Sequence, residues 1–425
     1  MARYKVSSSF LGIVFSAKIA FSKRSWPYVA AMAVPWLLCA GSRCVTRLCA
    51  LGSHRRSLSG YYRFLSDGKW RMELLFKSLF DLAVGTFRVA ELTLVLDDTL
   101  SPKWGRGIFG TGYHFDHTAR PRPGYIWGHN WVVLAVVVQV SSAAWVALPF
   151  WIALYRPKKR CGWGEFKTRH ELAVRALEAV RSWYSGRIEL LADGAYANGS
   201  LVRPARELGI ELVSRLRSNA RLRESKPRRQ PKSKRGRKPK RGPWLPSLSA
   251  LARRRSKFTS RTVAIYGKAV TLLVREVVAW WPPVGCEVKV VITRDPKRPR
   301  RVAYLVTTDL ALTAVEVVEL FARRWTIETL FSVAKNQMGL GSAEVRKERS
   351  VRRHAALCMA LVTWVHAWAH RFRPRLGARS FAAQLAGLRA DTIKQTIFAS
   401  GPRSQGSRRI ARDIASLFAQ ATRAA

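Results

Sequence analysis

Acidic residues are scarce in this sequence. Its 425 residues include 26 Asp and Glu against 75 Lys and Arg, which gives a net charge of +49 and an isoelectric point of about 11.4. So large an excess of one sign repels itself unless a polyanion neutralises it. Nucleic acid is therefore the natural partner, and its binding should weaken steeply with salt. Apolar residues make up 48% of the chain, which excludes a disordered basic tail and suffices for two or three domains.

The sequence also lacks paired cysteines. The six cysteines lie at positions 39, 44, 49, 161, 286 and 358, and no two of them have CxxC spacing. Cys44 and Cys49 lie close together, but no further Cys or His pair nearby completes a zinc site. We therefore expect isolated thiols in the reducing environment of the cytoplasm.

No segment has the pattern of a typical membrane helix. Residues 28–40 are apolar but too short to span a bilayer, and they contain Pro35; after Lys18, Lys23 and Arg24, a signal peptide is a weak alternative. Residues 131–155 carry no charge and would pass a crude hydropathy test. They are rich in Val and are interrupted by Gln139, two serines and Pro149, so we interpret them as two buried strands joined by a Ser turn. We expect no membrane association, with a membrane protein built on 131–155 as the rival hypothesis.

The order of the remaining segments predicts an α/β fold. Residues 1–90 are basic and helical in pattern, and we expect them to contact DNA. Strands are predicted at 92–96, 131–138 and 144–155, followed by a helix at 165–185, a strand at 188–192, a helix at 202–209 and a strand at 210–216. Three strands, helix, strand, helix, strand is the order of a ribonuclease-H-like core, here 91–216. In that topology the first strand is antiparallel to the second and parallel to the fourth.

Two carboxylates follow strands that this topology makes neighbours. Asp97 ends the first apolar run and Asp193 ends the fourth. Neighbouring strands lie about 4.8 Å apart, so the two acids can share a divalent cation, and without one they would repel each other. Strand alternation favours Asp97 over Asp98 as the ligand. His129 is predicted near Asp97, although a structural histidine is the more frequent case.

A basic, β-rich insertion is predicted at 217–310. Residues 217–257 are dominated by Arg, Lys, Pro and Ser and cannot pack a core. Arg235 and Arg237 form an Arg-Gly-Arg run that fits either a minor-groove hook or a flexible arm binding phosphates without specificity, and we favour the second. Strand-like segments follow up to residue 308, and we expect a small antiparallel sheet.

The third acid lies on a helix predicted at 312–338. Phe321, Arg324, Glu328 and Lys335 share one face at helical spacing, so one acid stands among two bases. Arg324 and Lys335 are expected to hold phosphates, and an ion pair of Arg324 with Glu328 is the alternative. Trp325 is more often a core residue than a DNA-stacking one. Residues 311–345 thus form a core helix region, and 346–425 a basic helical C-terminal region.

This pattern resembles the signature of IS4-type bacterial transposases, Y-x2-R-x3-E-x6-K. Arg324, Glu328 and Lys335 match it in identity and spacing, Asp97 in Asp-Asp-Thr matches the family's first acid, and Asp193 in Asp-Gly resembles the second. The local sequences Asp-Asp-Thr at Asp97 and Gly-His-Asn around His129 are similar to those of an IS701-like branch. Phe321 departs from the family, where a tyrosine helps to hold a phosphate. The lost hydroxyl removes one hydrogen bond, on the order of 1 kcal/mol, and leaves the metal ligands intact.

The resemblance implies a ribonuclease-H-like core interrupted by a β-rich insertion with a basic arm and flanked by helical N- and C-terminal regions. It implies a transposase whose acids Asp97, Asp193 and Glu328 hold two Mg²⁺ ions, with Mn²⁺ as a plausible substitute. Phe321, Arg324, Trp325, Lys335, Arg235 and Arg237 would contact DNA. We expect cleavage at the element's terminal inverted repeats and strand transfer into target DNA by a homodimer on DNA, in the bacterial cytoplasm at the nucleoid. The alternative is a decayed or domesticated transposase that only binds DNA.

Overall fold

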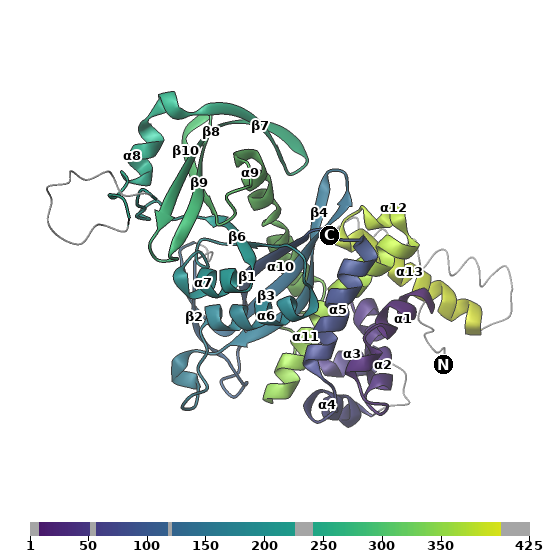
Figure 1. Cartoon of the computed structure of the whole chain (residues 1–425). Helices are drawn as coiled ribbons and strands as arrows, with labels where there is room; N and C mark the ends of the chain where they lie inside the picture. The colour runs from purple at the N-terminus through teal and green to yellow at the C-terminus, as the bar shows by residue number, and fades with distance from the viewer. Residues whose placement is uncertain (1–7, 52–56, 118–120, 226–240, 401–425) are drawn as a thin grey trace, which may run out of the picture.

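The predicted α/β class is confirmed by the computed structural model, which describes residues 8–51, 57–117, 121–225 and 241–400. These residues form one ten-stranded mixed sheet in the order β2-β3-β1-β5-β6-β10-β9-β8-β7, with β4 paired to β3 (Figure 1). Helices flank the sheet.

The centre of the sheet has the predicted strand directions. β1 (Leu92–Pro102) is antiparallel to β3 (Gly124–Ser141) and parallel to β5 (Ile188–Ala192), and β6 (Ile210–Arg215) is parallel to β5. The apolar residues 92–96 and 188–192 are buried, as expected for strands covered on both faces.

The long uncharged segment is a hairpin, as predicted. β3 and β4 (Ala144–Tyr155) pair antiparallel over most of their length. Along the part of the chain that the structure describes, no helix combines the length and the apolar character needed to cross a membrane.

A strand that was not among the predicted elements lies at one edge of the sheet. β2 (Gly112–Asp116) pairs with residues 124–128 of β3, so β3 begins earlier than predicted. The connecting helices are α6 (Arg169–Trp183) and α7 (Gly199–Glu207). Thr168 and Glu171 start α6 with a capping box, in which each side chain accepts a hydrogen bond from the other residue's backbone N–H.

The predicted small sheet of the insertion is not separate from the core. β7 (Thr259–Ile265), β8 (Lys268–Trp281), β9 (Cys286–Asp295) and β10 (Arg298–Thr307) form an antiparallel meander that also carries α8 (Leu248–Arg253). β10 pairs with β6 from Leu305↔Arg215 to Thr307↔Val213, so the meander continues the central sheet. The prediction that 217–257 cannot pack a core is wrong for its described parts, because Leu222, Leu248 and Leu251 are buried. Arg235 and Arg237 lie outside the described residues.

The predicted single helix over 312–338 is wrong, because the structure has two. α9 (Ala314–Arg323) ends and α10 (Thr326–Asn336) begins on either side of Arg324 and Trp325. Across the break the backbone N–H groups of Arg324, Trp325 and Glu328 bond carbonyls three residues back instead of four. These bonds have the tighter 3₁₀ pattern and separate the two α-helices. The break turns the Arg324 side chain toward the sheet, where it pairs with Asp97.

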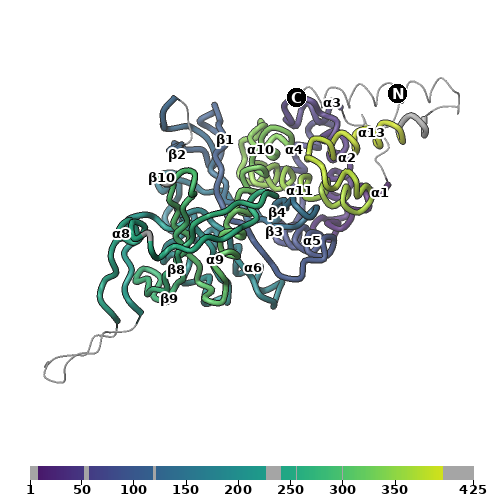
Figure 2. Tube along the Cα trace, turned by 90° about the horizontal axis from the view of Figure 1, so that it is seen from above, coloured from purple at the N-terminus to yellow at the C-terminus, as the bar shows by residue number. Residues whose placement is uncertain are grey.

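The N-terminal helices and the C-terminal helices pack together at the end of the molecule opposite the meander (Figure 2). They are α1 (Ser8–Phe15), α2 (Trp26–Leu38), α3 (Val45–Leu51), α4 (Leu58–Ser66), α5 (Met72–Phe87), α11 (Glu348–Phe372), α12 (Pro374–Gly377) and α13 (Phe381–Ser400). The apolar helix α11 lies against β4, α5, α4 and α1, and Arg353 of α11 donates a 2.9 Å hydrogen bond to the Leu65 carbonyl. DNA contact by the N-terminal helices stays a prediction. No disulfide forms among the six cysteines, all of which are described.

Candidate active site

The sheet register places two of the predicted acids side by side. The parallel β1–β5 ladder ends at Leu96↔Ala192, so Asp97 and Asp193 are the next residues on adjacent strands. β1 does not end at Asp97, as had been expected, but continues along β3 to Pro102. Asp97 therefore lies within a strand, where both neighbouring peptide groups are held, and its side chain is only 16% exposed.

Arg324 joins the first acid to the third. Its Nη1 lies 3.2 Å from Asp97 Oδ2 and 3.5 Å from Glu328 Oε1. The ion pair with Glu328, considered as the alternative role of Arg324, is thus present, and a second partner from β1 is added. Two carboxylates that are far apart in the sequence converge on one positive charge.

The environment of Asp97 disfavours its ionised form. Burial raises the pKa of this carboxyl from 3.8 to about 7. The negative charges of Asp98 and Glu328 act in the same direction, whereas the Asp98 backbone N–H and Arg324 lower the pKa. A nearby cation would favour the ionised form of this buried carboxyl group, which has more acids than bases around it.

Asp98 is held in a different way. Its oxygens accept hydrogen bonds from Arg169 at 2.9 and 3.1 Å, from the Tyr196 hydroxyl at 2.9 Å and from the Asn130 amide at 3.0 Å. These contacts fill its acceptor positions and fix it to α6 and the loop after β5. Asp97 lacks such a set of donors, and its role as the ligand in place of Asp98 stays a prediction.

Asp193 sits in the tight turn that follows β5. Its carbonyl accepts a 2.9 Å hydrogen bond from the Tyr196 N–H, and among the described residues no hydrogen bond or ion pair reaches its carboxylate. A Cβ on the next residue, Gly194, would come within 3.0 Å of the Arg215 carbonyl oxygen. The glycine therefore allows this turn to pack closely on β6.

The donor set fits a divalent cation. Carboxylate oxygens are the ligands that Mg²⁺ and Mn²⁺ prefer, and the Arg324 guanidinium already marks a point where Asp97 and Glu328 share a positive charge. Within the described ranges, no three Asp, Glu, His or Cys side chains stand close enough to hold a metal as they are. Asp97, Asp193 and Glu328 stay the predicted ligands, and Arg324 now lies between two of them.

The other residues of the predicted stripe lie around this point. Phe321 is partly buried, and the Arg324 guanidinium carbon is 5.8 Å from its ring. Burial lowers the pKa of Lys335, and the charges of Asp116 and Glu328 oppose this. Trp325 is 54% exposed, so the expectation of a core residue is wrong. It borders a cleft of about 460 Å³ that Tyr266 also lines.

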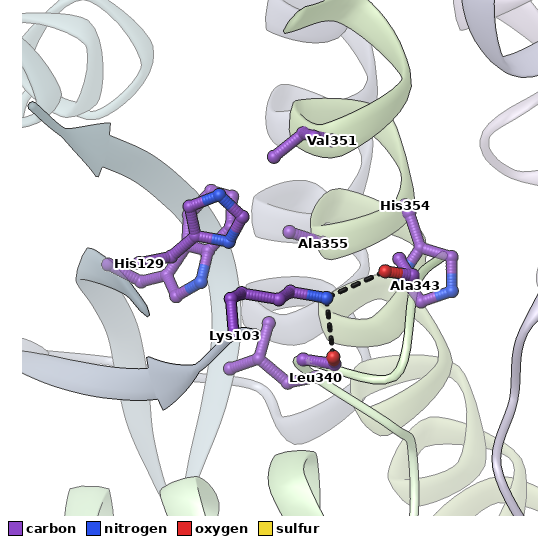
Figure 3. Close-up of a pocket in the computed structure, with 9 residues that line it drawn as sticks. Lys103, His129, Leu340, Ala343, Val351, His354 and Ala355 are labelled. Atoms are coloured by element: carbon purple, nitrogen blue, oxygen red, sulfur yellow. Dashed lines mark hydrogen bonds between the residues drawn. The ribbon is translucent and has the colours of Figure 1, made fainter. Parts of the chain in front are cut away.

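Lys103 connects the strand of Asp97 to the chain segment that follows α10. Its Nζ donates 2.6 Å hydrogen bonds to the carbonyls of Gly341 and Ala343, and Figure 3 shows it pointing toward them between His129 and His354. His129 pairs with Ser101, four residues along β1 from Asp97, and its Nε2 contacts the Phe109 carbonyl at 2.9 Å. The prediction that His129 lies beside Asp97 is therefore wrong. Lys103 had not been predicted as part of the site.

Carboxylates side by side on neighbouring strands of a ribonuclease-H-like sheet are typical of a class of metal-dependent nucleases. The family model described as DDE superfamily endonuclease matches residues 20–269, more than half of the chain, and the chain belongs to this family. Enzymes of this superfamily act on DNA and generally use divalent metals. Asp97 and Asp193 lie inside the matched residues, and Glu328 lies beyond them. No curated protein matches the chain.

Proposed function

We propose that the protein is a cut-and-paste DNA transposase that cleaves the ends of an insertion sequence of the IS4 type and joins them to target DNA. The observation that carries this proposal is the convergence of Asp97 and Glu328 on Arg324, with Asp193 next to Asp97 in the sheet. The family membership supports the nuclease chemistry.

In this proposal Asp97, Asp193 and Glu328 bind two divalent cations, Mg²⁺ or Mn²⁺. Bound there, the cations would activate the attacking oxygen and stabilise the leaving oxygen of a phosphodiester displacement. Arg324 moves from the acids to a DNA phosphate, since a guanidinium can bind phosphate in two-pronged fashion. Lys335 holds a neighbouring phosphate, and Phe321 and Trp325 pack against the DNA end.

The basic side chains of 217–257 and the helical regions 1–90 and 346–425 would supply non-specific DNA contacts. Two element ends have to be brought together, so we propose a homodimer on double-stranded DNA, in the bacterial cytoplasm at the nucleoid. The net charge of +49 supports a polyanionic partner.

The test uses the full chain and DNA that carries the terminal inverted repeats flanking its gene. With Mg²⁺ the wild type should nick these ends and join the new 3′-hydroxyl to a second DNA. Asp193→Asn and Glu328→Gln should abolish both steps, whereas Asp81→Asn, an exposed acid of α5, should change neither. Full strand transfer by either acid variant would exclude this mechanism.

The second candidate is a decayed transposase that binds DNA without cutting it. Phe321 favours it, because the resemblance places a tyrosine there. This candidate predicts DNA binding that is unchanged by EDTA, with no nicking at any concentration of Mg²⁺ or Mn²⁺.

A further inference from the structure

The hairpin of β2 and β3 exposes a row of aromatic side chains. Tyr113 faces Trp127 across the strands with ring centroids 5.0 Å apart, and Phe115 faces Tyr125 at 5.2 Å. Because side chains alternate along a strand, these four rings share one face of the hairpin. Tyr113 is 62% exposed and Tyr125 is 72% exposed. We call these four residues the aromatic ribbon.

Two tryptophans stand on the loops beside the ribbon. Trp104, on the loop between β1 and β2, is 98% exposed, and Trp163, on the loop after β4, is fully exposed. Single exposed aromatic side chains are common on proteins, but a cluster of them in one part of the surface indicates a binding site.

A basic cleft adjoins the ribbon. It has a volume of about 570 Å³ and is formed by the loop before β2, the turn after β4 and the start of α11. Its cationic lining residues are Arg106, Arg156, Lys159, Arg160, Arg346 and Lys347. Among the lining residues in the described part, Glu348 is the acid, and it pairs with Arg352 at 3.0 Å. Arg156 pairs with Glu165 at 3.1 Å, so the positive charge of the cleft comes from the other five basic residues.

Arg160 links the cleft to the ribbon. Its guanidinium carbon lies 5.2 Å from the Trp127 ring, and it donates hydrogen bonds to the carbonyls of Thr111 and Arg106. Backbone carbonyls hold this cation in place without neutralising it. A positive charge stacked on an aromatic ring is a typical element of surfaces that bind nucleic acid.

The ribbon lies on the path that leads away from the candidate active site. β1 runs from Asp97 to Pro102, about 17 Å at 3.3 Å per residue, and Pro102 and Gly112 both pair with Gly128 of β3. Asp116, at the end of β2, is close enough for its charge to act on Lys335. DNA bound at the acids would need only about five base pairs to reach the ribbon, at 3.4 Å per pair.

We propose that the ribbon and the cleft form a second DNA-binding site for a junction of duplex and unpaired bases. The cleft binds backbone phosphates, and the ribbon, with Trp104 and Trp163, stacks on unpaired bases. Bases inside a duplex already stack on each other, so exposed ring faces suit unpaired bases better. The proposal rests on the proposed function, because it takes DNA as the substrate.

The charge distribution favours DNA over a second copy of the protein. Another copy would carry the same net charge of +49 and the same basic cleft. Placing two such surfaces together would bring like charges into contact and would raise the free energy of association. A polyanion is attracted by the same charges.

The experiment measures the anisotropy of a labelled duplex and of the same duplex with a single-stranded extension, at several salt concentrations. Tyr113→Ala/Tyr125→Ala should weaken binding to the extended DNA about tenfold and leave duplex binding nearly unchanged. Tyr113→Phe/Tyr125→Phe keeps the ring faces and should bind like the wild type. Arg346→Ala/Lys347→Ala should reduce the slope of log affinity against log salt by about 1 to 2 for both DNAs.

Lys297→Ala/Arg298→Ala is the charge-matched control. Both residues are exposed at the β9–β10 turn of the meander, and β10 is the fourth strand from β3 in the sheet, so the salt slope should stay unchanged. Equal binding by the alanine ribbon variant and the wild type would overturn the stacking role, and an unchanged slope in the cleft variant would overturn the phosphate role. A loss of self-association in sedimentation, without a change in DNA affinity, would assign the surface to copies of the chain instead. If the wild type binds neither DNA, the proposed function itself fails.

Discussion

The two faces of β1 carry adjacent acids in opposite conditions. On one face Asp98 is surrounded by donors from Arg169, Tyr196 and Asn130. On the other face Asp97 has one cation, shared with Glu328, and burial raises its pKa to about 7. A buried acid whose oxygens are all hydrogen-bonded, like Asp98, contributes to the stability of the fold. An acid left underpaired in a buried position is unfavourable for stability and suits the binding of a cation.

The largest expected effect separates these two acids by activity. Asp97→Asn should lower metal-dependent nicking more than about 100-fold, the upper range for residues that only support a metal ligand. Asp98→Asn should keep activity within about tenfold per folded molecule. Asp98 is not a proposed metal ligand and only helps to hold β1 in place through its hydrogen bonds. Nicking rates at saturating Mg²⁺ measure both. An equal loss in both variants would erase the distinction between the two faces.

The next effect is on the free energy of unfolding and depends on pH. Asp97 has a folded-state pKa of about 7 against 3.8 when exposed, so the folded state holds a proton that the unfolded state has lost between these values. Stability therefore falls as pH rises from about 4 to 7, by up to about 4 kcal/mol. Asp97→Asn lacks this fall and should be more stable than the wild type at pH 8 without metal.

Urea unfolding in EDTA at pH 4.5 and pH 8 checks this prediction. The variant should gain relative to the wild type only at the higher pH. Asp81→Asn, whose acid pairs with Lys77 on an exposed helix face, should differ from the wild type equally at both pH values. A difference for Asp97→Asn that does not change with pH would contradict the raised pKa.

Asp98→Asn should have the opposite effect on stability. The substitution weakens the hydrogen bonds from Arg169 and Tyr196 and leaves the guanidinium without its acid. We expect a loss of about 1–3 kcal/mol at pH 8, read from the same unfolding curves. Arg169→Gln should lose less, since the Asp98 carboxylate keeps the Tyr196 and Asn130 donors. A stabilised Asp98→Asn would show that the two faces do not differ.

The sequence predicts the strands and the acids that follow them better than the long-range contacts that hold these acids in place. The order of strands and the identity of Asp97 and Asp193 follow from apolar runs that stop at acids, a local signal. The break at Arg324 leaves no such signal, because apolar periodicity continues from α9 into α10. The joining of the meander to β6 is equally hidden, since a strand pattern does not name its partner. Lys103 was missed because its partners are backbone carbonyls 238 and 240 residues away.

The smallest expected effect tests how the Asp97 face is held in position. Lys103 directly follows β1 and ties the end of that strand to the loop after α10, the helix of Glu328. Lys103→Met keeps the length of the side chain but leaves the carbonyls of Gly341 and Ala343 without a donor. Burial of a lysine is itself unfavourable, so the net loss of stability should be small, about 1 kcal/mol.

The nicking activity should fall by more than this loss of stability explains, because α10 is no longer held at a fixed distance from β1. A positioning role predicts that more Mn²⁺ is needed for half-maximal nicking, since Glu328 is displaced from Asp97. A purely structural role predicts an unchanged Mn²⁺ requirement in the molecules that remain folded, and the Mn²⁺ titration separates the two.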